Sequence, residues 1–271
     1  MTVCDKELAA AIDKAARKLK KHAVVHVKVD TGMGRLGVWH DEAGRLIKDL
    51  LGFKNIIIEG IFTHFASADE EDVRYTVRQI ESFKRLAAEM EINGIEVKYV
   101  HAANSAGAML YKDSHFNMVR PGLMLYGLYP NRKLTSVVEL KPALSLKTRI
   151  IYLKKTPPGR FISYGRTHMT KRETVIATLP IGYADGLNRR LSNSGEMLVR
   201  GRRAPIVGRI CMDHTMIDVG GIKDAKVGDE AVVIGSQRGE TITVEEIASL
   251  LDTIPYEVVC WISARVPRIY K

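Results

Sequence analysis

The spacing of apolar residues predicts alternating helices and strands in the first half of the chain. Apolar positions from Leu8 to Leu19 recur at helical spacing, and a β-branched strand follows over residues 23–30. The pattern then predicts a short helix near 41–51, a strand over 55–65 and a helix from Val73 that closes at Asn93 and Gly94. A strand over 95–102, a helix over 104–110 and one or two strands over 116–127 complete this half.

Strands that alternate with helices predict β/α units with parallel pairing. Polar side chains stand at the predicted strand ends: Lys28, His64, Asn104 and Arg120. The chemistry of a β/α barrel lies at the carboxyl ends of its strands, so this placement favours a partial (β/α) barrel of the TIM type over residues 1–136.

From about residue 137 the pattern changes to β runs punctuated by glycine, proline and asparagine. This composition predicts a mainly antiparallel β domain over 137–271, joined to the first half by a linker over 131–142. One clear helix interrupts the strands, because Thr243 and Glu246 form a capping box ahead of an apolar run. The predicted fold class is therefore α/β plus β.

Composition narrows the function classes. The 271 residues are 46% hydrophobic and 27% charged, as in ordinary globular proteins. The net charge of +10 is spread along the chain without a nucleic-acid-binding motif, which argues against nucleic acid as a partner. No apolar run is long enough to span a membrane, and the charged N-terminal residues are unlike a signal peptide. Three scattered cysteines form no metal-spaced pair and favour a reduced, cytoplasmic setting.

Seven segments in this order resemble bacterial alanine racemase, a pyridoxal-phosphate enzyme of fold type III. They are KVDTGMGRLG (28–37), THFASADE (63–70), HAANSAGAM (101–109), NMVRPGLMLYG (117–127), LPIGYADG (179–186), APIVGRICMDH (204–214) and IPYEVVCWISARVPRIY (254–270). The resemblance implies an amino-acid isomerase with an eight-stranded barrel followed by a β domain. It also implies a homodimer that interconverts L- and D-alanine by two-base proton transfer and supplies D-alanine for peptidoglycan.

The same resemblance implies three residues for proton transfer. Tyr183 matches the base that takes the α-proton of L-alanine, and a free tyrosine has a pKa near 10, so it needs assistance. His64 matches the histidine that links this tyrosine to an arginine, and Arg120 matches the arginine at the pyridine nitrogen. Without the resemblance, Tyr183 would be read as a turn residue, His64 as a core residue and Arg120 as half of an ion pair.

Further residues match the binding positions of the family. Lys28 matches a lysine that is often carbamylated, and Arg35 matches the arginine that this anion orients toward cofactor and substrate; a snorkelling lysine is the plain alternative. Met212 matches the residue whose backbone N–H meets the substrate carboxylate, and Tyr183 and Met212 act in trans in the family. The residues that match the phosphate contacts of the cofactor are Asn104, Ser105, Gly122 and Tyr256.

The family's Schiff-base lysine lies in a first-strand segment like V-V-K-A-D-A-Y-G-H-G, which this sequence does not contain. We therefore expect about three β/α units of the barrel to be missing, and a barrel that cannot close leaves strand edges exposed. A catalytically inactive fragment with a partial cofactor and substrate site is the alternative to an active racemase. A non-catalytic phosphate-binding module is a third reading, and a related pyridoxal-phosphate decarboxylase fits the segments at 179–186 and 204–214 poorly.

Overall fold

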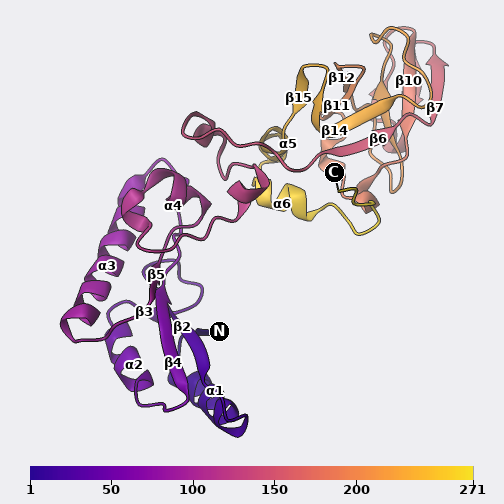
Figure 1. Cartoon of the computed structure of the whole chain (residues 1–271). Helices are drawn as coiled ribbons and strands as arrows, with labels where there is room; N and C mark the ends of the chain where they lie inside the picture. Colours follow the sequence, from indigo (N-terminus) through magenta and orange to yellow (C-terminus); the bar gives the residue numbers. More distant parts are fainter. Residues whose placement is uncertain (271) are drawn as a thin grey trace. The chain divides into compact units, whose positions relative to one another are not determined.

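The computed structural model describes residues 1–270, which form two compact units (Figure 1). The first unit comprises Met1–Leu125 with Lys133–Glu139, and the second comprises Tyr126–Arg132 with the chain from Leu140 onward. Because the segments between residues 126 and 139 alternate between the units, no single cut in the chain separates them. The domain boundary expected at residues 136 and 137 stays a prediction.

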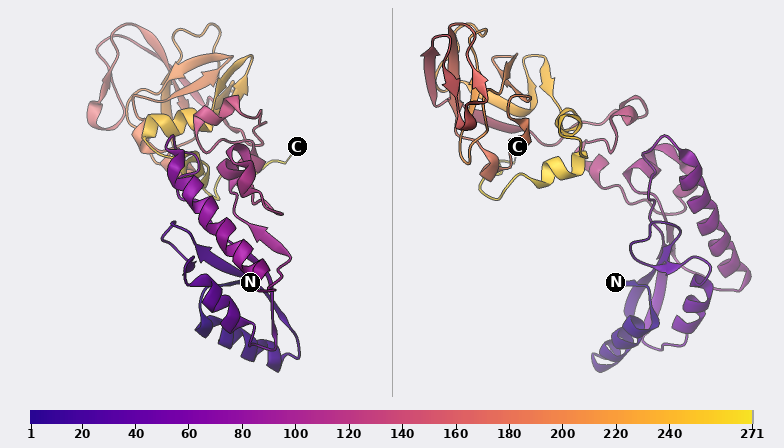
Figure 2. Two further views of the ribbon diagram at one scale, coloured as in Figure 1. Left: turned by 90° about the vertical axis from the view of Figure 1, so that its left-hand side faces the viewer. Right: turned by 180° about the vertical axis from the view of Figure 1, so that it is seen from behind.

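The first unit is built on a parallel sheet in the order β1-β2-β4-β5, with β3 beside β2. Its elements are β1 (Thr2–Val3), α1 (Lys6–Lys18), β2 (Ala23–Asp30), β3 (Val38–Trp39), α2 (Ala43–Leu50), β4 (Ile56–Phe62), α3 (Val73–Ile92), β5 (Tyr99–His101) and α4 (Ser105–Leu110). Figure 2 shows the long helix α3 running alongside the strands. The parallel β/α arrangement confirms the coarse fold prediction, while the closed eight-stranded barrel stays a prediction.

The two faces of strand β2 differ in what they carry. Val25, Val27 and Val29 are fully buried, and alternate residues of a strand point to opposite faces. Lys28 and Asp30 therefore lie on the other face, where both are also almost fully buried. The apolar core of this unit thus holds the strands in place, and the opposite face is free to carry polar chemistry.

The second unit contains antiparallel sheets in the orders β13-β10-β7 and β12-β11-β14-β15, with β6 paired to β14 and β8 paired to β9. Its strands are β6 (Leu146–Arg149), β7 (Tyr152–Thr156), β8 (Phe161–Ile162), β9 (His168–Met169), β10 (Thr174–Leu179), β11 (Glu196–Val199), β12 (Arg202–Pro205), β13 (Thr215–Asp218), β14 (Glu230–Gln237) and β15 (Glu240–Ile242). Two helices follow, α5 (Val244–Leu251) and α6 (Pro255–Cys260). The Thr243 hydroxyl accepts the Glu246 N–H at 3.0 Å, which confirms one half of the predicted capping box of α5, whereas the Glu246 carboxylate accepts from Arg203 instead of the Thr243 N–H.

Two expectations for individual elements were wrong. Residues 116–127 form no extended strand: Met118 makes one parallel bridge to His101, and Leu123–Tyr126 is a 3-10 turn. Pro121 provides the reason, since it has no N–H for a sheet ladder. The second half also has two helices instead of one, because α6 was missed. Among residues 1–270, no helix is both long and apolar enough to cross a membrane.

Candidate active site

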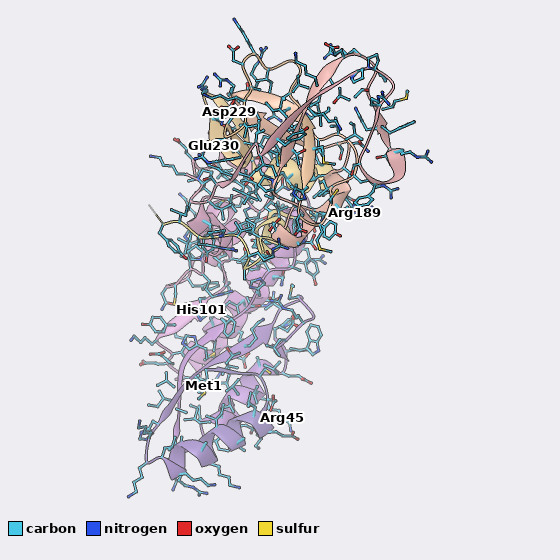
Figure 3. The ribbon with its side chains drawn as sticks, turned by 90° about the vertical axis from the view of Figure 1, so that its right-hand side faces the viewer. Met1, Arg45, His101, Arg189, Asp229 and Glu230 are labelled. Atoms are coloured by element: carbon cyan, nitrogen blue, oxygen red, sulfur yellow. The ribbon has the colours of Figure 1, made fainter. Side chains whose placement is uncertain are left out.

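Arg120 is the most heavily bonded side chain at the carboxyl ends of β4 and β5. Its Nη2 donates to the carbonyls of Thr63, at 2.7 Å, and Ala102, at 3.0 Å. Its Nη1 lies 2.7 Å from Nδ1 of His101, a residue labelled in Figure 3. Burial lowers the pKa of Arg120 to about 10, so the group is still a cation at neutral pH. The planar guanidinium group of Arg120 is thus held by acceptors at the carboxyl ends of β4 and β5.

His64 lies beside Arg120 on the loop that leaves β4. Its Nδ1 is 3.4 Å from Nη2 of Arg120, a long contact in which the guanidinium is the donor. Burial, together with the charges of Arg120, Arg35 and Lys28, lowers the pKa of His64 to about 4. The ring is therefore neutral at pH 7. With Nδ1 as the acceptor, Nε2 carries the proton and is the nitrogen able to donate.

A buried glutamine on α3 holds the loops after β2 and β4 together. The amide of Gln79 donates to the Thr31 hydroxyl at 3.1 Å and to the His64 carbonyl at 3.2 Å, and it accepts the Ala66 N–H at 3.0 Å. The hydroxyls of Thr31 and Thr63 lie 2.7 Å apart. The backbone on both sides of His64 is thereby tied to the loop that leads to Arg35.

Lys28 is buried at the end of β2, with 5% of its surface exposed. Its Nζ donates to the Val29 carbonyl at 2.9 Å and lies 5.5 Å from the centre of the Phe62 ring. Burial lowers its pKa to about 8, Asp30 opposes this shift, and the charges of Arg120 and Arg35 add to it. A larger fraction of this amine is therefore neutral at pH 7 than for an ordinary lysine.

Asp30 shapes the loop that carries Arg35. Its carboxylate accepts the backbone N–H groups of Gly32, Met33 and Gly34 at 2.8 to 2.9 Å. Burial raises the pKa of Asp30, but these three hydrogen bonds outweigh it, and the pKa is lowered overall. Arg35 itself is exposed, so the structure positions its backbone through Asp30 and leaves its side chain at the surface.

Three of the four residues expected to contact a phosphate, Asn104, Ser105 and Gly122, lie together in the first unit. The Ser105 hydroxyl accepts the N–H groups of Gly122 at 3.0 Å and Met124 at 3.2 Å. The Asn104 side chain caps α4 by accepting the Gly107 N–H at 2.9 Å. A Cβ built on Gly122 would meet only the Ser105 hydroxyl, at 3.9 Å, so the backbone here is open to close approach.

Tyr183 and Met212 lie side by side in the second unit, and both are exposed. The Tyr183 N–H donates to the Cys211 carbonyl and the Ala184 N–H to the Met212 carbonyl, each at 3.1 Å. A Cβ on Gly182 would lie 2.3 Å from both carbonyl oxygens, so only glycine allows this approach. The side chains of Tyr183 and Met212 are 43% and 53% exposed, which leaves them available to a partner.

Tyr183 stands at a surface hollow of the second unit. The hollow is lined by Tyr183, Gly186, Asn188, Arg189 and Trp261. Arg265 forms ion pairs with Asp185 at 3.4 Å and with Asp213 at 2.7 Å, and so links the segment that carries Tyr183 to the segment that carries Met212. Tyr256, on α6 of the same unit, is also exposed, and the structure does not relate it to the Ser105 cluster of the first unit.

The buried His101 and the half-buried His64 make the stability of the first unit depend on pH. Burial, followed by the charge of Arg120, lowers the pKa of His101 to about 3, and the pKa of His64 is lowered to about 4. Both rings titrate near 6.5 when the chain unfolds. The unfolded chain therefore binds more protons below pH 6.5, and we expect stability to fall as the pH falls from about 6.5 toward 4.

Urea midpoints measured across this range check the expectation. A His64→Asn variant removes one of the two titrating groups, so its stability should fall less steeply with acid. His22→Asn alters an exposed histidine and should keep the slope of the unaltered chain. Equal slopes for all three proteins would contradict the assignment.

Several residues of this site were missed in the sequence. His101 holds Arg120 and Gln79 holds the His64 loop, while His26 contacts His101 and Glu59 contacts His26. A histidine two residues before Lys28 and a glutamate three before Phe62 give no local signal, because their proximity depends on strand register. His101 stands inside the segment at 101–109, so the segment was found while its buried histidine was not.

Comparisons with known proteins agree over both units. The model of the alanine racemase N-terminal domain matches residues 1–130, and that of the C-terminal domain matches residues 143–270. The alanine racemase of Halothermothrix orenii is 52% identical over 270 residues, which is 100% of this chain and 71% of that protein. The alanine racemase of Carboxydothermus hydrogenoformans is 48% identical over 99% of this chain and 73% of its own length.

Solved structures give the same result. Alanine racemase from Clostridium difficile 630 matches with a TM-score of 0.92 and 42% identity over 100% of this chain and 70% of its own. That of Bacillus anthracis with bound L-Ala-P matches with a TM-score of 0.89 and 39% identity over 100% of this chain and 70% of its own. The fold and its site are those of a pyridoxal-phosphate-dependent amino-acid isomerase. The chain belongs to the alanine racemase family.

Proposed function

We propose that Tyr183 is the base that exchanges a proton with the α-carbon of L-alanine, assisted by His64 and Arg120. The observation that carries this proposal is the fixed Arg120 fork, which holds a cation against Nδ1 of His64. An N–H donor at Nε2 of His64 stabilises a phenolate oxygen brought near it. Racemisation needs one base on each face of the α-carbon, and the family's Schiff-base lysine is the second.

The residues of the first unit fit pyridoxal 5'-phosphate. Gly122 leaves room beside the Ser105 hydroxyl, and Ser105, Asn104 and Gly122 would hold the phosphate together with Tyr256. Within residues 1–270, the hydrogen bonds of Arg120 leave its Nε–H without an acceptor, and this donor would face the pyridine nitrogen. When bound, the cofactor supplies the electron-withdrawing ring that makes the α-proton of the substrate acidic.

Lys28 and Arg35 would bind on the substrate side. Arg35 would meet the cofactor's phenolic oxygen and the substrate carboxylate, and the backbone N–H of Met212 would meet the same carboxylate. Carbamylation of Lys28 would turn a buried cation between Arg35 and Arg120 into an anion that attracts both. The lowered pKa of Lys28 supports this, because only a neutral amine attacks carbon dioxide.

Carbamylation is expected to rise with pH through about 8, as Lys28 loses its proton. Native mass spectrometry of the chain in bicarbonate buffer should show one added carboxyl group, absent from a Lys28→Met variant. A Lys98→Met variant, which alters an exposed lysine, should keep the addition. A mass without the addition at every pH would contradict carbamylation.

The homodimer is part of the same proposal. Tyr183 and Met212 are exposed and locked together in the second unit, as expected of groups that complete a partner's site. The product D-alanine would serve peptidoglycan synthesis, which places the enzyme in the cytoplasm. The parallel strands of the first unit would belong to an eight-stranded barrel of the kind the family resemblance implies.

A fusion protein tests the proposed function. The N-terminal segment of the Halothermothrix orenii enzyme, which the resemblance predicts to carry the Schiff-base lysine, is joined ahead of Met1. With pyridoxal phosphate, the fusion should racemise alanine in both directions, and replacing that lysine by alanine should abolish turnover. The unfused chain should bind pyridoxal phosphate weakly and turn over nothing. A folded, cofactor-loaded fusion that racemises no alanine would favour the inactive fragment instead.

A further inference from the structure

Two rows of side chains lie on the polar face of the parallel sheet. Strand register places His26 opposite Gly60 and Gly60 opposite Tyr99. Two residues further along the strands, Lys28 stands opposite Phe62 and Phe62 opposite His101. The His101 and Phe62 rings stack at 5.0 Å with 3° between their planes, and His101 is buried. The Arg120 guanidinium lies 5.3 Å from the centre of the Phe62 ring, so the second row packs against Arg120, and the first row lies two residues closer to the start of the strands.

Gly60 provides the space that lets the two rows touch. A Cβ at this position would lie 2.8 Å from Cε1 and Nδ1 of the His26 ring and 2.6 Å from the Tyr99 carbonyl oxygen. With no side chain there, the His26 ring leans across β4 and stacks on Tyr99 at 5.9 Å. This brings Nδ1 of His26 to 2.8 Å from Nε2 of His101.

Four side chains then form one continuous path. Arg120 Nη1 lies 2.7 Å from His101 Nδ1, and His101 Nε2 lies 2.8 Å from His26 Nδ1. His26 Nε2 lies 3.3 Å from the Glu59 carboxylate. The path starts at the Arg120 guanidinium and ends on the Glu59 carboxylate of β4, which is one third exposed.

Chemistry fixes the direction of every hydrogen bond in this path. A guanidinium only donates, so His101 Nδ1 must be a bare acceptor. A neutral imidazole with a bare Nδ1 carries its proton on Nε2, and that proton is donated to His26 Nδ1. His26 then carries its own proton on Nε2 and donates it to Glu59, which only accepts. Reversing any one bond would set two donors against each other at Arg120.

We propose that His26 and Glu59 are positioning residues that hold His101 as a fixed acceptor for Arg120. This inference rests on the proposed role of Arg120 at the cofactor. The Glu59 carboxylate sets the tautomer of His26, His26 sets that of His101, and His101 keeps Nη1 of Arg120 in place. A carboxylate that orients an imidazole is a common device for aiming a second group. Here two imidazoles, those of His26 and His101, lie between the Glu59 carboxylate and Arg120.

A surface ion pair is the competing explanation for Glu59. Its other oxygen lies 3.9 Å from Nζ of Lys98, an exposed lysine that also lies over the Tyr99 ring. Exposed pairs of this kind contribute little to stability. If Glu59 paired only with Lys98, removing Glu59 or Lys98 would have the same effect on the protein. If Glu59 orients His26, removing Glu59 changes the histidine tautomers, and removing Lys98 does not.

The test is the imidazole nitrogen spectrum of the chain labelled with 15N-histidine. In the unaltered chain His26 and His101 should both show the neutral form with the proton on Nε2. In the Glu59→Ala variant, His26 should show a mixture of the two neutral tautomers, and the nitrogen signals of His101 should broaden. Glu59→Gln keeps an acceptor and should preserve both forms, and Lys98→Met should leave both unchanged. A proton on Nδ1 of His101 in the unaltered chain, or no change in Glu59→Ala, would overturn the proposal.

Kinetics of the lysine-bearing fusion give the second readout. Glu59→Ala should lower kcat about tenfold with little change in KM, because one hydrogen bond in the path is lost and substrate contacts remain. Glu59→Gln should recover most of this loss, and Lys98→Met should match the unaltered fusion. An unchanged kcat in an active Glu59→Ala fusion would overturn the positioning role. If the unaltered fusion is inactive, the proposed function fails, while the tautomers still decide this inference.

Discussion

Replacing Tyr183 by phenylalanine is expected to lower the kcat of the lysine-bearing fusion by about 10² to 10⁴-fold, the usual contribution of a positioned acid or base. The ring stays and only the hydroxyl is lost. Because the side chain is 43% exposed, we expect folding to be unaffected. Racemisation should be measured from both enantiomers, since each direction needs both bases.

Exchange of the α-proton with solvent deuterium separates the two bases. In the Tyr183→Phe fusion, exchange from D-alanine should continue through the lysine, whereas exchange from L-alanine should be lost. Tyr152→Phe is the matched control, because Tyr152 is a 57% exposed tyrosine on β7 of the same unit. Equal losses of exchange from both enantiomers would contradict the assignment of Tyr183 to the L face.

Replacing Arg120 by methionine is expected to destabilise the first unit and to remove racemase activity. The carbonyls of Thr63 and Ala102 and Nδ1 of His101 would lose their donor together. Each buried acceptor left without a partner costs about 1–3 kcal/mol. Urea unfolding of the chain should therefore show a loss of roughly 3 kcal/mol or more.

Two further variants separate charge from geometry at this position. Arg120→Lys keeps a cation but not the planar fork, so most of the stability loss should remain. Arg85→Met alters an exposed arginine of α3 whose side chain donates a hydrogen bond to Ser82, and its effect on the free energy of unfolding should stay within about 0.5 kcal/mol. An Arg120→Met chain as stable as this control would show that the fork is not a structural anchor.

Much of the fold follows from local patterns in the sequence. Helix α3 runs over Val73–Ile92 and ends at Asn93, where the apolar stripe stops and Gly94 follows. The misjudged strand near residues 116–127 had apolar residues at strand-like density, but Pro121 and the 3-10 turn at Leu123–Tyr126 leave one bridge only. Helix α6 was missed because six residues with a proline at the start carry too little periodicity to identify a helix.

The site was predictable only in part. Polar residues that follow strands, such as His64 and Arg120, stand out against the apolar runs before them. His26 and Glu59 lie within strands, where a polar residue is normally read as facing solvent. Their contact depends on Gly60 and on the register between β2, β4 and β5, and neither can be seen in one segment alone.

The close backbone contact at Gly182 has a consequence for attempts to change substrate preference. The loops that carry Tyr183 and Met212 share two backbone hydrogen bonds, and there is no room for a Cβ on Gly182 between them. We therefore expect the two loops to move together as a rigid unit. Shifting either loop to make room for a bulkier amino acid would displace the proposed base Tyr183 and the proposed carboxylate contact at Met212 together. Selection for new substrates should therefore accumulate changes beside the two loops, at Asn188, Arg189 or Trp261, and leave Gly182 unchanged.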